Sequence, residues 1–357
     1  MVTPLVVRHS AGSYAVIVRS GGCADVPQLV EERHPHARPV VIADATVAEL
    51  LPSPLAAAPV FTFPAGERHK TRATWSTLTD QLMAAHFGRD TVIVAFGGGV
   101  TTDLAGFVAA TFLRGVPWIA VPTTTLAMLD AAVGGKTGVD TAAGKNLVGA
   151  VHPPSAVLCD PATLTTLPAR IFREGLAEAV KHAVALDPRY ADWIAAHSDL
   201  IADRDPVTLE SLVRRSVELK AEVVMDDESE QGRRAVLNAG HTIAHALERV
   251  TDYAVPHGEA VAIGLVLETR VAEAMRVATP GTADRIAQLF TRLGLPVDLP
   301  GNITAASLIA AMGSDKKNRA GTVRAALLAS FGEVADAGAD IWTFPLDLEA
   351  LEALMAH

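Results

Sequence analysis

Hydrophobic positions in the first 160 residues follow two alternating patterns. Residues 39–44, 91–96 and 118–121 are short apolar runs rich in β-branched side chains, as expected of strands buried on both faces of a sheet. Intervening segments such as 73–85 carry apolar residues at helical spacing. Strands and helices that alternate in this way from residue 13 to 160 predict a parallel α/β sheet.

From Thr163 onward the pattern changes to long amphipathic segments, and strand signals are rare apart from Val323–Ala329. The predicted helices cover 174–186, 189–203, 206–226, 236–251, 258–277, 282–293 and 304–313. We therefore expect an α/β protein with an N-terminal Rossmann-like parallel-sheet domain over 1–160 and a mostly α-helical domain over 161–357. A site is expected in the cleft between two such domains.

The stretch 90–122 reads as strand, glycine turn, helix and strand. Gly97-Gly98-Gly99 leads into a helix N-terminus, whose free N–H groups and positive dipole end suit a pyrophosphate. However, Thr102 stands where the dinucleotide fingerprint G-x-G-x-x-G has its third glycine. Nucleotide binding and a turn that serves packing alone both remain open.

Two nearby positions carry polar residues after predicted strands. Asp44 ends the strand at 39–44, where it could bond a ribose hydroxyl or simply stabilise a turn. Glu67 and Lys70 would share a helical face, an arrangement typical of a surface ion pair.

The segment 130–146 combines four glycines with Lys136, Lys145 and Asn146. Glycine-rich backbone together with lysine suits an anionic substrate. The segment lacks the P-loop pattern, so it is not a nucleotide-binding loop of that kind. The alternative is a long surface loop with solvated lysines.

Imidazoles and a carboxylate form a candidate metal set in the helical half. His241 and His245 would share one helical face, His257 follows a short turn, and Glu178 lies on a predicted helix. These ligand types suit zinc. Spacing alone pairs His241 with His245, and core or surface histidines without a metal are the alternative. The H-E-x-x-H motif is absent, so zincin proteolysis has no support.

A basic group in the same half comprises Lys220, Arg233, Arg234, Lys316 and Lys317. It is interpreted either as a solvated face or as a clamp for a carboxylate or phosphate.

Composition and charge limit the expected cellular compartment and the classes of binding partner. The net charge of −10 argues against a nucleic-acid partner and makes clustered lysines informative. The two cysteines give no disulfide framework. No apolar run reaches about 18 residues, and the N-terminus lacks a signal-peptide core. We therefore expect a cytoplasmic protein that neither spans a membrane nor binds nucleic acid.

Six sequence blocks in consistent order resemble the 3-dehydroquinate synthases and related sugar-phosphate cyclases. They read GGGVTTDLAGFVAATFLRG, VPTTTLAMLDAAVGGKTGVDTAAGKNLVGA, GLAEAVKH, RAVLNAGHTIAHALE, VPHGEAVAIG and MGSDKKNRAG. The resemblance runs from about residue 13 to 330. The chain departs from the family pattern at Thr102 and at Arg173-Glu174, which affects the detail of the cofactor contact and not the fold.

The resemblance implies bound NAD, a zinc ion that cobalt could replace, a small sugar-phosphate substrate and a homodimer. The implied cofactor contacts are Asp44, Glu67, Lys70, Gly97, Gly98, Gly99, Val100, Asp103, Thr123, Thr124, Lys145 and Thr166. The implied metal ligands are Glu178, His241 and His257, which replaces the pairing of His241 with His245.

The resemblance also assigns the substrate site. The implied catalytic residues are Asp130, Lys136, Lys181, Lys220, Arg234, Asn238 and His245. The implied substrate-binding residues are Lys136, Lys145, Asn146, Lys220, Arg234, Asn238, His245 and Lys316, with Arg114 contributed across a dimer interface. Of these, Lys136, Lys220 and Arg234 match the carboxylate and hydroxyl contacts of the family.

The implied reaction converts 3-deoxy-D-arabino-heptulosonate 7-phosphate into 3-dehydroquinate by oxidation, phosphate elimination, reduction and ring closure. A cyclase of secondary metabolism, of the 2-epi-5-epi-valiolone synthase or amino-dehydroquinate synthase type, is the nearest alternative. A zinc- and NAD-dependent polyol dehydrogenase and a non-catalytic nucleotide-binding module are alternatives of other classes. The cationic set favours a substrate with a carboxylate, because buried charges need partners.

Overall fold

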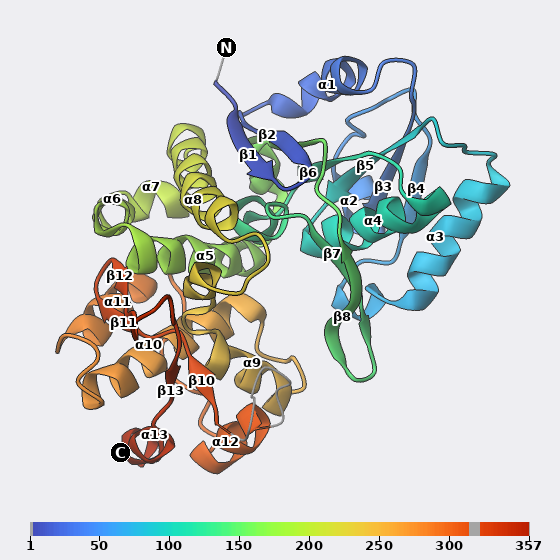
Figure 1. Cartoon of the computed structure of the whole chain (residues 1–357). Helices are drawn as coiled ribbons and strands as arrows, with labels where there is room; N and C mark the ends of the chain where they lie inside the picture. The colour runs from blue at the N-terminus through green and yellow to red at the C-terminus, as the bar shows by residue number, and fades with distance from the viewer. Residues whose placement is uncertain (1–2, 314–321, 357) are drawn as a thin grey trace. The chain divides into compact units, whose positions relative to one another are not determined.

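The computed structural model describes residues 3–313 and 322–356 and divides the chain into two compact units (Figure 1). The first comprises Met1–Pro168 and Leu209–Ala221, and the second Ala169–Thr208 and Glu222–His357. The first unit therefore runs to Pro168, whereas the predicted boundary is at residue 160. It also includes Leu209–Ala221, which lies in the half of the chain predicted to form the helical domain.

A seven-stranded sheet forms the centre of the first unit, in the order β1-β2-β9-β6-β5-β3-β4 (Figure 1). Only the β1–β2 pairing is antiparallel, so the predicted parallel sheet is confirmed. Every residue of β5 is buried, as expected from its continuous apolar run. The strands are β1 (Leu5–His9), β2 (Gly12–Val18), β3 (Arg38–Asp44), β4 (Val60–Phe63), β5 (Thr91–Gly97), β6 (Trp118–Pro122) and β9 (Ala156–Cys159).

Helices of the first unit agree with the hydrophobic periodicity. They are α1 (Val26–Arg33), α2 (Ala45–Leu50), α3 (Arg72–Ala84) and α4 (Gly99–Thr111). The glycine-rich segment 130–146 differs from expectation, because it belongs largely to a hairpin. A π-helical turn at Ala127–Ala131 leads into β7 (Lys136–Thr141), which pairs with β8 (Gly144–Val151).

The second unit is mostly helical, as predicted, with two small antiparallel pairs, β10–β13 and β11–β12. Its elements are α5 (Ala169–Leu186), α6 (Pro188–Ala196), α7 (Ser198–Ala202), α9 (His241–Val250), α10 (His257–Ala274), α11 (Thr282–Arg292), α12 (Ala305–Gly313), α13 (Leu348–Met355), β10 (Arg324–Ala325), β11 (Leu328–Ser330), β12 (Glu333–Val334) and β13 (Phe344–Pro345). Helix α8 (Pro206–Asp226) contributes residues to both units. No described helix is both long and apolar enough to span a membrane.

Two predicted helices are interrupted in the structure. The segment 189–203 divides into α6 and α7 at His197. The segment 236–251 begins as a short 3-10 helix over Arg233–Asn238, and α9 starts only at His241, because Gly240 adopts a left-handed conformation with φ of 80°. His241 is therefore the first residue of a helix rather than an interior one.

Glycines allow α10 to pack closely on α5 and α9. A Cβ atom on Gly258 would lie 2.0 Å from the carbonyl oxygen of Glu174 in α5. A Cβ atom on Gly264 would lie 2.3 Å from the carbonyl oxygen of Gly240, which immediately precedes α9. Because both obstacles are backbone atoms, neither contact can be relieved by rotating a side chain.

A buried carboxylate fixes the start of α9 from the side of α10. Glu268 is 1% exposed, and its two oxygens accept the backbone N–H groups of Gly240 and Ile243, each at 2.8 Å. These N–H groups at a helix N-terminus lack partners within the helix. The carboxylate therefore satisfies them and sets the position of the first turn of α9.

We predict that Gly258→Ala destabilises the protein, because the first turn of α10 must move away from α5. Overpacking of this kind costs about 1–3 kcal/mol, measurable as a lower midpoint of thermal or urea unfolding. Gly301→Ala is the matched control, since a Cβ there meets no atom within 4 Å. Equal stability of the two variants would contradict the packing argument.

Candidate functional site

The glycine turn of the first unit presents an uncapped helix N-terminus. Gly97 ends β5, Gly98 is the N-cap of α4, and no side chain caps this end. The first N–H groups of α4 have no intrahelical acceptor, and the helix dipole makes this end positive. Such a turn at the carboxyl end of a central parallel strand is suited to an anionic phosphate.

Thr102, the departure from the fingerprint, fits within the turn. It is 1% exposed, and its hydroxyl donates to the carbonyl oxygen of Gly99 at 3.1 Å. Thr101 donates to a carboxylate oxygen of Asp44 at 3.1 Å, while the other oxygen of Asp44 accepts the N–H of Val47 and caps α2. Asp44 thus stabilises a turn and contacts the helix that follows the glycines.

A buried lysine connects this helix to the β7–β8 hairpin. Lys70 is 3% exposed, and its ammonium donates to Asp103 at 2.6 Å and to the side-chain oxygen of Asn146 at 2.5 Å. Burial by itself lowers the pKa of Lys70, but the charges of Asp103 and Glu67 outweigh it and raise that pKa. Lys70 is therefore a fixed positive charge beside the glycine turn.

Asn146 is itself held in place by the hairpin. It adopts a positive φ of 53°, and its N–H donates to Asp140 at 2.8 Å. Neighbouring Lys145 lies 3.8 Å from Glu67, so Glu67 has an ion-pair partner other than the predicted Lys70.

Threonines after β6 line the same end of the sheet. The N–H of Thr123 donates to Gly97 at 2.9 Å, but its hydroxyl, in a residue only 2% exposed, has no partner among the described residues. Thr124 accepts the N–H of Ala127. Thr166 instead donates to Thr163 in the 3-10 helix Pro161–Thr166.

Asp130 and Lys220 form a further charged pair of this unit. Lys220 of α8 donates to the backbone carbonyl of Asp130 at 2.5 Å and to its carboxylate at 2.8 Å. Asp130 lies on the π-helical turn, a local irregularity frequent at functional sites. Lys136, at the start of β7, is exposed.

Three side chains of the second unit converge on one point. Glu178 of α5 is fully buried, and one of its oxygens lies 3.7 Å from Nε2 of His241 and 3.6 Å from Nε2 of His257. One ligand atom from each residue lies within 4.8 Å of the other two. A carboxylate oxygen and two imidazole nitrogens match a three-ligand zinc site that leaves a fourth position open.

The electrostatics of this set fit a cation. Lys181 of α5 contacts the carboxylate of Glu178. Burial, followed by the charge of Lys181, lowers the pKa of His241, which keeps this imidazole in the neutral form that binds metals. Burial also acts to lower the pKa of His257, but hydrogen bonds to Glu178 and Glu248 raise it to about 10. The carboxylates thus favour a positive charge beside them.

His245 is close to this set but outside it. Its ring centre is 5.4 Å from that of His241 and 6.3 Å from that of His257. The structure therefore groups His241 with His257 and Glu178, and not with His245 as spacing alone indicates. The reason is that α10 brings His257 back to α5 and α9.

The predicted carboxylate-binding arginine is held by its own loop. Arg234 is 4% exposed and donates from its guanidinium to the carbonyl oxygen of Glu228 at 2.9 Å. Asp227 accepts the N–H groups of Gln231, Gly232 and Arg234, while Asn238 donates to Glu230 at 3.1 Å. The predicted Lys316, and Lys317 beside it, lie outside the described residues.

Sequence reasoning missed several carboxylates that organise these groups. Glu268 gave no recognisable signal, because its partners are backbone N–H groups more than 20 residues away along the chain, and Asp140 gave none because the turn that brings the N–H of Asn146 to it was not predicted. Glu248 could have been found, since it lies seven residues after His241 and so on the same face of α9.

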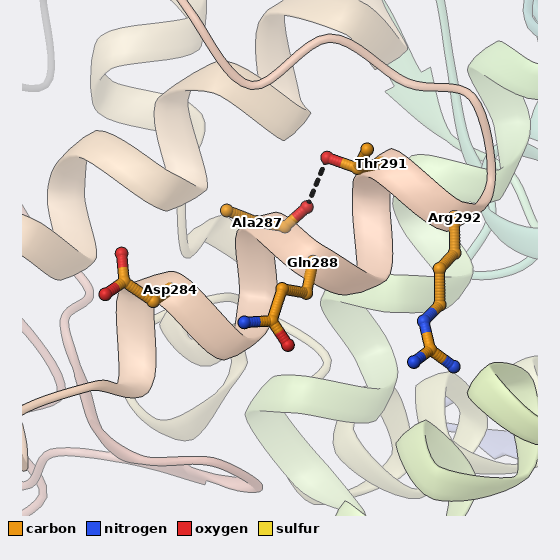
Figure 2. Close-up of a pocket in the computed structure, with 5 residues that line it drawn as sticks. All are labelled: Asp284, Ala287, Gln288, Thr291 and Arg292. Atoms are coloured by element: carbon orange, nitrogen blue, oxygen red, sulfur yellow. Dashed lines mark hydrogen bonds between the residues drawn. The ribbon is translucent and has the colours of Figure 1, made fainter.

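A separate hollow occurs on α11 of the second unit (Figure 2). It is lined by Asp284, Ala287, Gln288, Thr291 and Arg292. The hydroxyl of Thr291 is occupied by the carbonyl oxygen of Ala287 at 2.8 Å. None of the predicted site residues lines this hollow, so it is not the candidate site.

Comparison with known families gives two adjoining matches. Residues 60–174 match the family model for 3-dehydroquinate synthase N-terminal regions, and residues 175–318 match that for the C-terminal regions. A 3-dehydroquinate synthase from Pelobacter propionicus is 44% identical over 329 residues, which are 90% of this chain and 91% of that protein.

Solved structures of related cyclases share the fold. A 2-deoxy-scyllo-inosose synthase complexed with carbaglucose-6-phosphate, NAD⁺ and Co²⁺ has a TM-score of 0.88 at 25% identity, covering 99% of both chains. A 2-epi-5-epi-valiolone synthase from Streptomyces hygroscopicus subsp. jinggangensis 5008, with NAD⁺ and Zn²⁺ bound, has a TM-score of 0.86 at 29% identity, covering 100% of this chain and 98% of that one.

Proposed function

We propose that this chain, which belongs to the 3-dehydroquinate synthase family, converts 3-deoxy-D-arabino-heptulosonate 7-phosphate into 3-dehydroquinate with elimination of phosphate. The observation that carries the proposal is the convergence of Glu178, His241 and His257 in a chain so similar to known 3-dehydroquinate synthases. The cofactors are NAD and a divalent metal, zinc or cobalt. The reaction belongs to the shikimate pathway and aromatic amino acid biosynthesis, in the cytoplasm.

NAD is assigned to the carboxyl end of the sheet in the first unit. Its pyrophosphate would accept N–H groups at Gly98, Gly99 and Val100, and the remaining contacts are those implied by the family resemblance. When bound, NAD supplies reversible hydride transfer, so it is restored in each turnover. The ion pair with Asp103 holds Lys70 near α4, and both residues are among the proposed cofactor contacts.

The metal is assigned to Glu178, His241 and His257. When bound, it acts as a Lewis acid toward the hydroxyl that is oxidised. The protein's own contribution is to keep His241 neutral and to hold a carboxylate that would be costly to bury without a cation. Lys181 contacts the same carboxylate and, with His245 and Asn238, is assigned to the phosphate end of the substrate.

The substrate's carboxylate is assigned to Arg234, Lys136 and Lys220. Arg234 is buried with its guanidinium oriented by the carbonyl oxygen of Glu228, which preorganises a fork for a carboxylate. Lys220 is oriented by Asp130, which is assigned to the reacting hydroxyls. Lys145, Asn146 and Lys316 complete the proposed substrate contacts.

A homodimer is proposed because Arg114 matches a residue that the family contributes across a dimer interface. Leu113 and Arg114 both have positive φ, 50° and 70°, a strained conformation for residues with side chains. Arg114 is exposed, in keeping with a side chain that reaches a partner.

A cyclase acting on sedoheptulose 7-phosphate or glucose 6-phosphate is the second candidate, because solved structures of such cyclases share the fold. Their identities of 25% and 29% are well below the 44% to a 3-dehydroquinate synthase, which favours the heptulosonate. Those sugar phosphates also lack a carboxylate, so a buried Arg234 would meet a neutral group at the position where the heptulosonate carries a charge.

The three glycines of the turn differ in whether packing within the protein requires a glycine. A Cβ on Gly97 would lie 2.3 Å from the hydroxyl of Thr101, and one on Gly98 would lie 2.9 Å from a methyl group of Thr124. A Cβ on Gly99 would meet only Ala131, at an ordinary 3.5 Å. Packing among the described residues therefore explains Gly97 and Gly98 but leaves Gly99 to be explained by a ligand.

We predict that Gly99→Ala folds as the parent protein does but binds NAD at least ~10-fold more weakly, because the methyl group obstructs close approach of the pyrophosphate. Isothermal titration with NAD and thermal unfolding would be measured together. Gly97→Ala is the comparison, and it should lose stability as well. Unchanged NAD affinity of Gly99→Ala would place the pyrophosphate elsewhere.

The function is tested by phosphate release from the zinc- and NAD-loaded protein. Three substrates are compared: 3-deoxy-D-arabino-heptulosonate 7-phosphate, sedoheptulose 7-phosphate and glucose 6-phosphate. We expect release from the first alone, with no net NADH. Release only from another sugar phosphate would reassign the substrate, and net NADH without phosphate would indicate a polyol dehydrogenase.

A further inference from the structure

Glu248 is a buried carboxylate that lies beside the metal set without belonging to it. It is 4% exposed on α9, whose first residue is His241. One of its oxygens lies 3.4 Å from Nδ1 of His257. The other ring nitrogen of His257, Nε2, faces Glu178 at 3.6 Å. The two nitrogens of this ring therefore face two different carboxylates.

We propose that Glu248 is a positioning residue that accepts the Nδ1–H of His257 and so presents the Nε2 lone pair to the metal. This rests on the metal site of the proposed function. A histidine ligand commonly donates its second N–H to a carboxylate, which fixes the tautomer and the ring orientation and strengthens the ligand. Glu248 occupies the place of that carboxylate.

The geometry distinguishes this role from two others. Glu248 is not itself a ligand, because the oxygen described above approaches the ring nitrogen that faces away from Glu178. A role limited to helix capping is served instead by Glu268, whose two oxygens are taken by the N–H groups of Gly240 and Ile243. Glu248, in contrast, is a buried carboxylate that faces a ligand ring without being one of the three proposed ligands.

His257 needs such a restraint because of where it lies. It is the first residue of α10, and the N-cap residue before it, Pro256, makes no side-chain hydrogen bond. Its side chain is 28% exposed, whereas that of Glu178 is 1% exposed. A ring at a helix end with this exposure is less confined by packing than Glu178. The contact with Glu248 limits its rotation.

The test measures metal affinity rather than turnover. Wild-type protein, Glu248→Gln and Glu248→Leu are freed of metal, and Zn²⁺ is titrated against a chromophoric chelator. We expect Glu248→Gln to bind Zn²⁺ about 10- to 100-fold more weakly, as is usual for loss of such a carboxylate. The absorption spectrum of bound Co²⁺ should change as well, because the ligand ring is reoriented.

Glu273→Gln is the matched control. Glu273 lies on α10, as His257 does, and it accepts the N–H of Ala283 at 2.8 Å. This variant should lose stability but keep wild-type Zn²⁺ affinity and the wild-type Co²⁺ spectrum. A general loosening of α10 would instead weaken metal binding in both variants and would overturn the proposal.

Two further outcomes would contradict the role of Glu248 or the metal site itself. Zn²⁺ affinity of Glu248→Gln within twofold of wild type, with an unchanged Co²⁺ spectrum, would overturn the role of Glu248 while leaving the metal site intact. Wild-type protein that binds no stoichiometric Zn²⁺ would overturn the metal site as well. If Glu248→Leu does not fold, the isosteric Gln variant still decides.

Discussion

The structure of the second unit depends on the burial of Glu178. A carboxylate removed from water costs several kcal/mol unless cations and donors surround it. Here Lys181 contacts it and two imidazole nitrogens lie within 3.7 Å. This arrangement requires α5, α9 and α10 to approach until backbone atoms nearly touch, and Gly258 and Gly264 permit that approach. The packing of three helices and the proposed chemistry of the metal are consequences of the same contact.

In the first unit, backbone N–H groups rather than side chains form the proposed anion-binding position. A central strand ends in glycines, and the N-terminus of α4 is left uncapped, so that its N–H groups remain for an anion. Lys70, tied to Asp103 and Asn146, adds a positive charge that does not depend on a flexible surface side chain. These features agree with the proposal that the first unit binds the nucleotide cofactor and the second unit binds the metal.

Much of the fold could be predicted because hydrophobic periodicity is strong in buried strands and amphipathic helices. The β7–β8 hairpin could not be, since its glycines and lysines resemble a surface loop and Asn146 adopts a positive φ. The start of α9 at His241 was also not predicted. The hydrophobic periodicity continues through Gly240 and gives no sign of the left-handed conformation of this glycine. Nor does periodicity say with which unit a helix packs, as Leu209–Ala221 shows.

The candidate site was predicted through resemblance more than through spacing. Spacing pairs His241 with His245 on one helix, whereas the structure adds His257 from α10 and Glu178 from α5. No local pattern reveals which segments a fold will bring together. The most direct measurement is anomalous diffraction at the zinc edge from crystals of the zinc-loaded protein. The account predicts a single peak bounded by Glu178, His241 and His257, and a peak between His241 and His245, or none at this place, would contradict it.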